Sequence, residues 1–262
     1  MKNGSVKIKM NSYEHSNESH FRSYRKYFNS GFYKKRYPRP NFKTLNTILN
    51  KSDSGKIIVD IGCGDGRYAL PVSSTCKSLY ALDISEEAVE DLRQEIADKS
   101  LKNIEVSIFK PPISLKNVAS KISIDGIIVI FGVLSHIVDE EVRHRLLCEI
   151  YDSLKIDGFL ILSVPNSSRR FKMEQKSQDS STITYTRSHQ WSVLEFRYKL
   201  FQADELQNEL RNAGFSNVKV VSESIMPETL VVNSGIMGWL DKLLCAIVPT
   251  RWAYGYLVTA IK

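Results

Sequence analysis

The sequence predicts an α/β fold built on a mostly parallel sheet. Short apolar runs of strand length alternate along the chain with longer segments of helical period. A glycine-rich turn, VDIGCGDGR at 59–67, joins the first apolar run to a helical segment. Because strands that alternate with helices are connected by right-handed crossovers, we expect parallel strands with helices on both faces of the sheet.

The strands and helices follow one another in a regular order from residue 41. The helix at 85–100 has the clearest start, because Ser85 can cap it and Glu86 and Glu87 stand where the helix dipole favours acids. Gly214 is expected to end the helix at 202–215. Strands are predicted at 56–62, 78–84, 104–109, 125–132, 158–165, 217–224 and 253–262, and helices at 41–50, 67–75, 85–100, 139–154, 202–215 and 235–247.

Two segments stand apart from this alternation, and they define the predicted domain organisation. Residues 1–19 are polar without periodicity and are expected to form a disordered tail, followed by a basic, aromatic arm at 20–50 and a domain at 51–262. Within that domain, 166–190 is expected to be a long polar insertion that closes, together with the arm, as a lid. The arm has one aromatic face at helical spacing, formed by Phe21, Tyr24, Tyr27 and Phe28.

The charge is concentrated near the N-terminus. Residues 1–55 contain twelve Lys or Arg and three acids, in a chain whose net charge is +7. This excess indicates either contact with the phosphates of a nucleic acid or anionic substrate, or simply a solvated arm. No apolar run is long enough to span a membrane, the first twenty residues lack an apolar signal core, and the spacing of the four cysteines does not suggest a metal site. We therefore expect a cytoplasmic protein.

The glycine turn predicts a ligand site at the carboxyl edge of the sheet. The dinucleotide fingerprint is G-x-G-x-x-G, whereas here Gly62, Gly64 and Gly66 alternate, and Asp65 disfavours a phosphate in the turn. Asp83 ends the second strand and can accept hydrogen bonds from both hydroxyls of a ribose. A nucleoside with a cationic or zwitterionic tail is the ligand that these residues indicate, and a nicotinamide dehydrogenase is disfavoured.

These residues resemble the class I S-adenosylmethionine-dependent methyltransferases. The resemblance extends over residues 36–262 and is carried by DIGCGDG at 60–66, by Asp83, by FGVLSHI at 131–137 and by SLKIDGFLILSVPN at 153–166. It implies a doubly wound, seven-stranded sheet whose last strand is antiparallel, with S-adenosylmethionine as the cofactor.

The resemblance also implies roles for individual residues. The glycines would lie beneath the methionine and ribose, Asp60 would face the amino group, Asp83 the ribose and Ile84 the adenine. Lys110 stands where many relatives have an acid for the adenine amino group, so this contact is not explained. The implied cofactor-binding residues are Asp60, Gly62, Cys63, Gly64, Gly66, Asp83, Ile84 and Phe131, with Cys63 expected to be a small packing residue.

Methyl transfer from a sulfonium mainly requires alignment of the nucleophile and exclusion of water. A general base is needed only when the acceptor must lose a proton. Four residues are candidates for a catalytic role, and the first of them could equally be a structural histidine: His136, Tyr33, Tyr37 and His189.

The acceptor is less clearly indicated than the cofactor. Segments 34–49 and 197–206 resemble the wobble-uridine tRNA methyltransferases, but similar segments recur in enzymes with small substrates, and the chain after 222 has no counterpart there. We therefore favour a small-molecule or natural-product acceptor over tRNA. A protein that binds S-adenosylmethionine without transferring its methyl group stays a further alternative. The apolar helix near 235–247 could line an acceptor pocket or touch a membrane, although such helices most often belong to the core.

Overall fold

The computed structural model describes residues 23, 25–26, 31–109, 115, 123–189 and 192–262. The predicted tail at 1–19, the four aromatic residues assigned to one face of the arm, and Lys110 all lie outside the described residues. The main sheet has seven strands in the order β3-β2-β1-β4-β5-β9-β8. Their bounds are β1 Ile57–Ile61, β2 Ser78–Asp83, β3 Ile104–Ile108, β4 Ile124–Val129, β5 Leu154–Pro165, β8 Ser216–Ser224 and β9 Gly255–Ile261.

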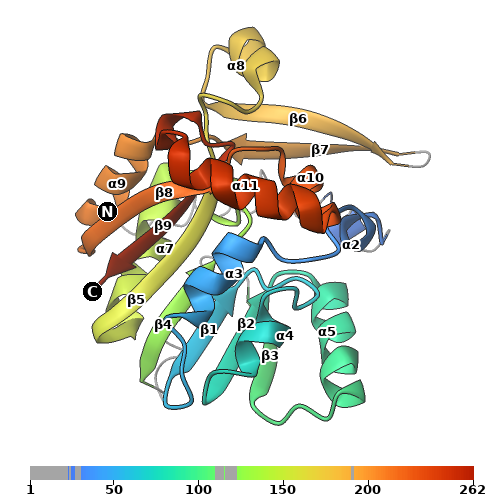
Figure 1. Ribbon diagram of the computed structural model, residues 1–262, viewed down its shortest axis with the longest axis vertical. Coiled ribbons are helices and arrows are strands. Elements are labelled where there is room, and N and C mark those ends of the chain that lie inside the picture. The colour runs from blue at the N-terminus through green and yellow to red at the C-terminus, as the bar shows by residue number, and fades with distance from the viewer. Residues whose placement is uncertain (1–22, 24, 27–30, 110–114, 116–122, 190–191) are drawn as a thin grey trace, which may run out of the picture.

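The direction of the strands confirms the predicted fold class. β1 pairs in parallel with both β2 and β4, and β9 pairs antiparallel with both β5 and β8. Helices cover both faces of the sheet, as expected for a doubly wound fold (Figure 1). The helices of the main domain are α3 Phe42–Leu49, α4 Ala69–Ser73, α5 Glu86–Asp98, α7 Glu140–Ser153 and α9 Ala203–Asn212.

Two hydrophobic clusters hold these layers together. One cluster joins α3, α4 and α5 to one face of the sheet through residues such as Ile48, Val72 and Leu92. The other joins α7 and α9 to the opposite face through residues such as Leu147 and Leu210. The carboxyl ends of β1, β2, β4 and β5 therefore meet at one edge of a rigid platform, which is where ligands bind in open α/β sheets.

The polar insertion predicted at 166–190 forms an ordered cap that contains regular secondary structure. It contains α8 (Lys172–Gln178) and β6 (Thr182–His189), and β6 pairs with β7 (Ser192–Lys199) in a separate two-stranded sheet. Figure 1 shows this hairpin beyond the edge of the main sheet. Apolar and polar residues alternate along both strands, and this alternation was a sequence signal for a hairpin.

The C-terminal apolar helix does not belong to the core, contrary to the expectation. It follows the short α10 (Glu228–Asn233) as α11 (Gly235–Ile247), and Asp241 is its buried residue. Trp239 and Ile247 are 59% and 77% exposed. Within the described part of the chain, no helix is long and apolar enough to cross a membrane.

Candidate functional site

The glycine turn takes a backbone conformation that favours glycine at all three positions. Gly62, Gly64 and Gly66 have φ angles of 78°, 55° and 85°. A Cβ on Gly62 would lie 2.3 Å from Val133, and one on Gly66 would lie 2.4 Å from the buried Leu92. Packing of the protein itself therefore requires Gly62 and Gly66, so their lack of side chains is not by itself evidence of a ligand.

Asp83 ties this turn to the end of β2. Its Oδ2 accepts a hydrogen bond from the amide of Gly64 at 2.8 Å, and its Oδ1 accepts one from Ser85 at 2.9 Å. Burial raises the pKa of Asp83, and these backbone hydrogen bonds oppose the rise. Each carboxylate oxygen can accept a further hydrogen bond, so the group can still bind hydroxyls of a ligand. Ile84, next in the chain, is half-buried.

Asp60 has a buried oxygen atom without a partner in the protein. The side chain is 2% exposed, and its Oδ2 makes no hydrogen bond. Burial, reinforced by the nearby Asp83, raises the pKa of Asp60 to about 8. A cation placed beside this group would stabilise its ionised form, and an ammonium would also supply the missing hydrogen-bond donor.

Four aromatic rings form a cation-binding box beside Asp60. In this structure the box surrounds the guanidinium of Arg67, which lies 4.2 Å from the ring centre of Phe131 and 5.2 Å from that of Tyr68. Tyr33 and Tyr37 complete the aromatic box at 5.6 and 5.7 Å. Phe131 has a left-handed φ of 65°, and its amide donates to Ser163 Oγ at 2.8 Å. Ring faces at these distances stabilise a positive charge.

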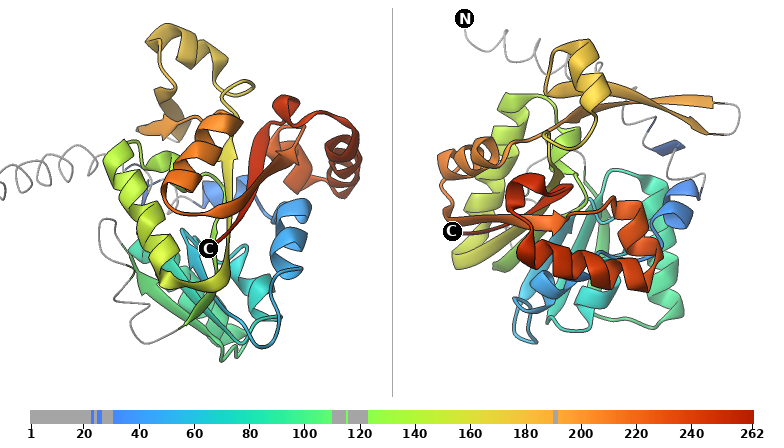
Figure 2. Two further views of the ribbon diagram at one scale, coloured as in Figure 1. Left: turned by 90° about the vertical axis from the view of Figure 1, so that its left-hand side faces the viewer. Right: turned by 45° about the horizontal axis from the view of Figure 1, so that its top comes forward.

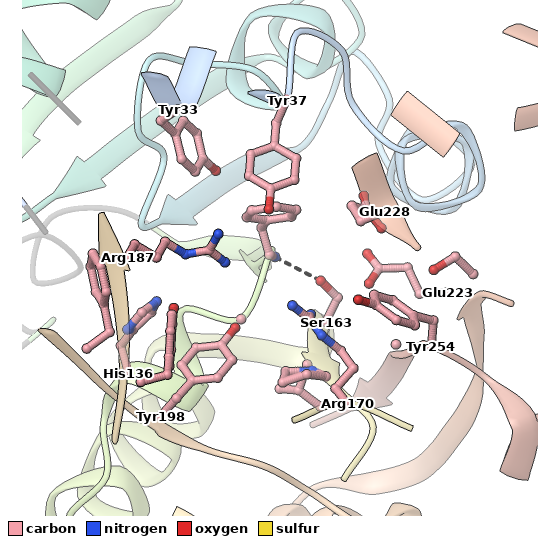
Figure 3. A pocket seen from close by; sticks show the side chains of 18 residues that line it. Tyr33, Tyr37, His136, Ser163, Arg170, Arg187, Tyr198, Glu223, Glu228 and Tyr254 are labelled. Atoms are coloured by element: carbon pink, nitrogen blue, oxygen red, sulfur yellow. Dashed lines mark hydrogen bonds between the residues drawn. The ribbon is translucent and has the colours of Figure 1, made fainter. Parts of the chain in front are cut away.

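Two cavities meet at this box. The smaller one, the turn cavity, is lined by Asp60, Gly62, Cys63 and Arg67. The larger one, the cap cavity, lies between the ends of β4 and β5 and the β6–β7 hairpin (Figure 3). Both are lined by Tyr33 and Phe131, so a ligand in the turn cavity can reach a second molecule in the cap cavity.

The structure brings three of the four candidate catalytic residues together in the cap cavity. His136, Tyr33 and Tyr37 all line it, and the His136 ring packs on Tyr198 with 4.7 Å between ring centres. The side chain of His189 lies outside the described residues. Cys63 is buried within the turn, and burial raises the pKa of its thiol well above its ordinary value, so it is not activated as a nucleophile.

Sequence reasoning missed two buried carboxyl groups in the cap cavity, Glu223 near the end of β8 and Glu228 at the start of α10. Glu223 Oε1 accepts a hydrogen bond from the Thr44 hydroxyl at 2.8 Å. Burial, reinforced by the neighbouring Glu228, raises the pKa of Glu223 to about 8. Burial also raises the pKa of Glu228, whose Oε1 has no hydrogen-bond partner, while Arg67 and Arg170 oppose the rise.

Two arginines in the cap were also missed. Arg170 lies 4.8 Å from the ring centre of Tyr254, and Arg187 lies 5.4 Å from that of Tyr185. Figure 3 shows Arg187 on one side of the cap cavity and the two glutamates on the other, with Arg170 between them. Both arginines also line the outer opening of the cap cavity, here called its mouth. The charged residues of the mouth are four bases and two acids: Arg36, Arg170, Lys172, Arg187, Glu174 and Glu228.

A family model described as a methyltransferase domain matches residues 33–220, which include the turn, the aromatic box and most of the cap. The chain belongs to the methyltransferase domain family. The family assignment confirms the predicted cofactor, S-adenosylmethionine.

Curated relatives match this methyltransferase over short segments. A probable cobalt-precorrin-6B C(15)-methyltransferase from Methanocaldococcus jannaschii is 36% identical over 58 residues, which are 22% of this chain and 30% of the relative. A ribosomal protein L11 methyltransferase from Thermoanaerobacter pseudethanolicus is 26% identical over 55% of this chain and 43% of its own length. The chain thus spans less than half the length of these relatives.

A solved structure matches almost the whole methyltransferase chain. It is an S-adenosylmethionine-dependent methyltransferase from Thermotoga maritima, a possible histamine N-methyltransferase, with a TM-score of 0.60 and 16% identity. The match covers 92% of this chain and 99% of that chain. At this identity the likeness establishes the fold, and the acceptor has to be inferred from the residues of this site.

Proposed function

We propose that this chain transfers a methyl group from S-adenosylmethionine to a small polar acceptor that carries a carboxylate or phosphate. One observation carries the proposal: the turn cavity and the cap cavity share Tyr33 and Phe131, and they differ in chemistry. The turn cavity has features that suit the cofactor, whereas the cap cavity is lined by arginines, glutamates and tyrosines.

The residues around the turn fit the cofactor. The unpartnered Oδ2 of Asp60 suits its ammonium group, and Asp83 suits its ribose hydroxyls. Tyr33 and Phe131 would lie beside the sulfonium, because these two rings line both cavities. Gly62, Gly64 and Ile84 would lie against the rest of the molecule, with Gly66 and Cys63 supporting the turn from within the protein. When bound, the cofactor supplies an electrophilic methyl group on a positively charged sulfur.

The mouth of the cap cavity favours an anionic acceptor. Basic side chains outnumber acids there, and Arg170 and Arg187 are both shared with the interior of the cavity. Stacking on tyrosine rings restricts both guanidinium groups, which lowers the entropy lost when they bind an anion. The planar guanidinium matches a carboxylate or phosphate with paired hydrogen bonds.

Glu228 is the group best placed to accept a proton, if the nucleophile must lose one. It lines the cap cavity, and its Oε1 has no hydrogen-bond partner in the protein. It also lies next to Glu223, and the raised pKa of Glu223 allows the two carboxyl groups to share a proton near neutral pH. His136, Tyr33 and Tyr37 line the same cavity and would orient the acceptor. The hairpin and the arm would exclude water from the reacting atoms.

A tRNA substrate is the second candidate, because the basic mouth of the cap cavity would also attract a phosphate backbone. Incubation with methyl-labelled S-adenosylmethionine separates the two. We expect label in metabolites that an anion exchanger retains, and none in bulk tRNA. Label in tRNA alone would overturn the small-molecule proposal. Absence of label from every pool would show a binding protein without transfer activity.

Matched variants test the two cavities separately. Asp83→Ala should weaken binding of S-adenosylhomocysteine, measured by calorimetry, by roughly 10- to 100-fold, because a charged hydrogen-bond partner is lost. The control, Asp91→Ala, changes an exposed residue and should bind normally. Arg187→Met should leave this binding unchanged and raise the KM for the labelled metabolite. Equal KM values for the variant and the wild type would contradict the acceptor assignment.

A further inference from the structure

α11 presents apolar side chains to the outside of the molecule. Ile236, Trp239, Leu240, Leu243 and Ile247 are 71%, 59%, 37%, 47% and 77% exposed. Their spacing places them along one side of the helix, here called the α11 face. Figures 1 and 2 show α11 on the outside of the molecule, across the end of α3 and beside β8.

The inward side of the helix is anchored by a buried acid, Asp241, which lies among the half-buried Met237, Leu244 and Cys245. Asp241 is 3% exposed, and its Oδ1 accepts the amides of Ile225 and Met226, both at 2.8 Å. Ser234 caps the start of the helix by accepting the amide of Met237. These contacts hold the α11 face outward, so its exposure is built into the fold rather than caused by a loose segment.

The surroundings of the α11 face are basic. In the sequence, residues 31–50 contain five Lys or Arg and no acid, and residues 229–252 contain Lys242, Arg251 and a single acid, the buried Asp241. The two segments lie together, because Arg39 donates to the carbonyl of Asn233 and Lys242 lies 5.4 Å from the ring centre of Phe42. An exposed apolar stripe is thus flanked by positive charge.

We propose that the α11 face docks on a membrane surface rich in anionic phospholipid. Apolar side chains would enter the boundary between headgroups and acyl chains, and the flanking lysines and arginines would contact the lipid phosphates. Trp239 and the exposed Trp252 have the amphipathic rings that favour this boundary. A second copy of the chain is a poorer occupant, because a two-fold interface would bring the basic flank against itself.

Docking would also set the position of the cap cavity relative to the lipid. α10 begins with Glu228 and Thr229, which line the mouth of that cavity, and leads directly into α11. Arg36, from the same mouth, accepts the side-chain amide of Asn233 through its carbonyl. The cavity mouth therefore lies beside the surface that would meet the membrane.

Sedimentation with vesicles tests the proposal. The full chain should sediment with vesicles of phosphatidylcholine and phosphatidylglycerol, less with phosphatidylcholine alone, and less again at high salt, which screens the charges. A variant with Ile236→Ser, Trp239→Ser and Ile247→Ser should lose at least tenfold in partitioning. The control with Ile156→Ser and Val193→Ser changes residues that are 85% and 69% exposed and lie outside the α11 face and the cavities, and it should sediment like the wild type.

Three further measurements keep the test decisive. Affinity for S-adenosylhomocysteine should be unchanged in the triple variant, which shows that it is folded. Lys242→Glu keeps the α11 face intact and should still weaken binding to anionic vesicles. Equal sedimentation of the triple variant and the wild type would overturn the proposal. So would a dimer, seen by light scattering, that the same three substitutions dissociate.

Discussion

The two cavities of this protein are built in different ways. The turn cavity takes most of its polar groups from one short segment at the end of β1, Asp60 to Arg67. The cap cavity takes them from segments far apart in the chain, which carry His136, Arg170, Arg187 and Glu223. The proposed cofactor site thus depends on the backbone of the platform. The proposed acceptor site depends on side chains that can change without altering the platform.

Each cavity also contains a carboxyl group with a pKa raised to about 8, but the two differ in what surrounds them. Asp60 has an oxygen without a hydrogen-bond partner in the protein. Glu223 instead accepts a hydrogen bond from Thr44 and lies beside the carboxyl group of Glu228. The first is suited to a ligand that brings a positive charge. The second is suited to hold a proton between two neighbouring acids.

The largest expected effect is a loss of stability when a glycine of the turn is replaced. Gly66→Ala places a methyl group 2.4 Å from Leu92 at a φ of 85°. Strain at positive φ and overpacking together should cost about 2–5 kcal/mol of unfolding free energy, measured by denaturant titration. Gly235→Ala is the control, because its Cβ would meet nothing within 4 Å. Equal stability of the two variants would show that packing does not require glycine at this turn.

The next effect concerns the charge of Asp60. Because its pKa is about 8 and a bound ammonium would favour the ionised form, binding of S-adenosylhomocysteine should release a proton. Affinity should therefore rise with pH below about 8, by up to tenfold per pH unit. Asp60→Asn should remove this slope, and Asp91→Asn should retain it, as measured by calorimetry at several pH values. A slope that persists in Asp60→Asn would assign the proton to another group.

The smallest effect concerns Glu223 and the free protein. A carboxyl group with a raised pKa holds its proton more tightly when folded, so its contribution to stability is present at low pH and falls as pH rises toward about 8. Between about pH 6.5 and 7.5, the unfolding free energy of Glu223→Gln should fall by roughly 1 kcal/mol less than that of the wild type, which corresponds to about 2–4 °C in Tm. Parallel curves of Tm against pH for the two proteins would contradict the assigned pKa.

Much of the platform could be predicted, because its signals are local. The strand alternation, the Ser85 cap and the glycine turn each depend on neighbouring residues, and the observed β1, β2 and α5 lie within two residues of the predicted bounds. The β6–β7 hairpin was missed although its alternation was present, because polar residues on its outer side resembled a loop. The glutamates were missed because no local pattern shows that Glu223 and Glu228 face a cavity.

The sequence by itself determined the doubly wound sheet, the glycine turn and the helical period of α11, since these follow from backbone preferences and hydrophobic spacing. Only the tertiary structure decided which side of α11 faces outward and which distant side chains enclose the cap cavity. Periodicity specifies which residues share a face of a helix or strand, but the partner of that face is chosen by packing over the whole chain. Buried Asp241 illustrates the point, because two backbone amides after β8, of Ile225 and Met226, hold the one acid of this mostly apolar helix inward.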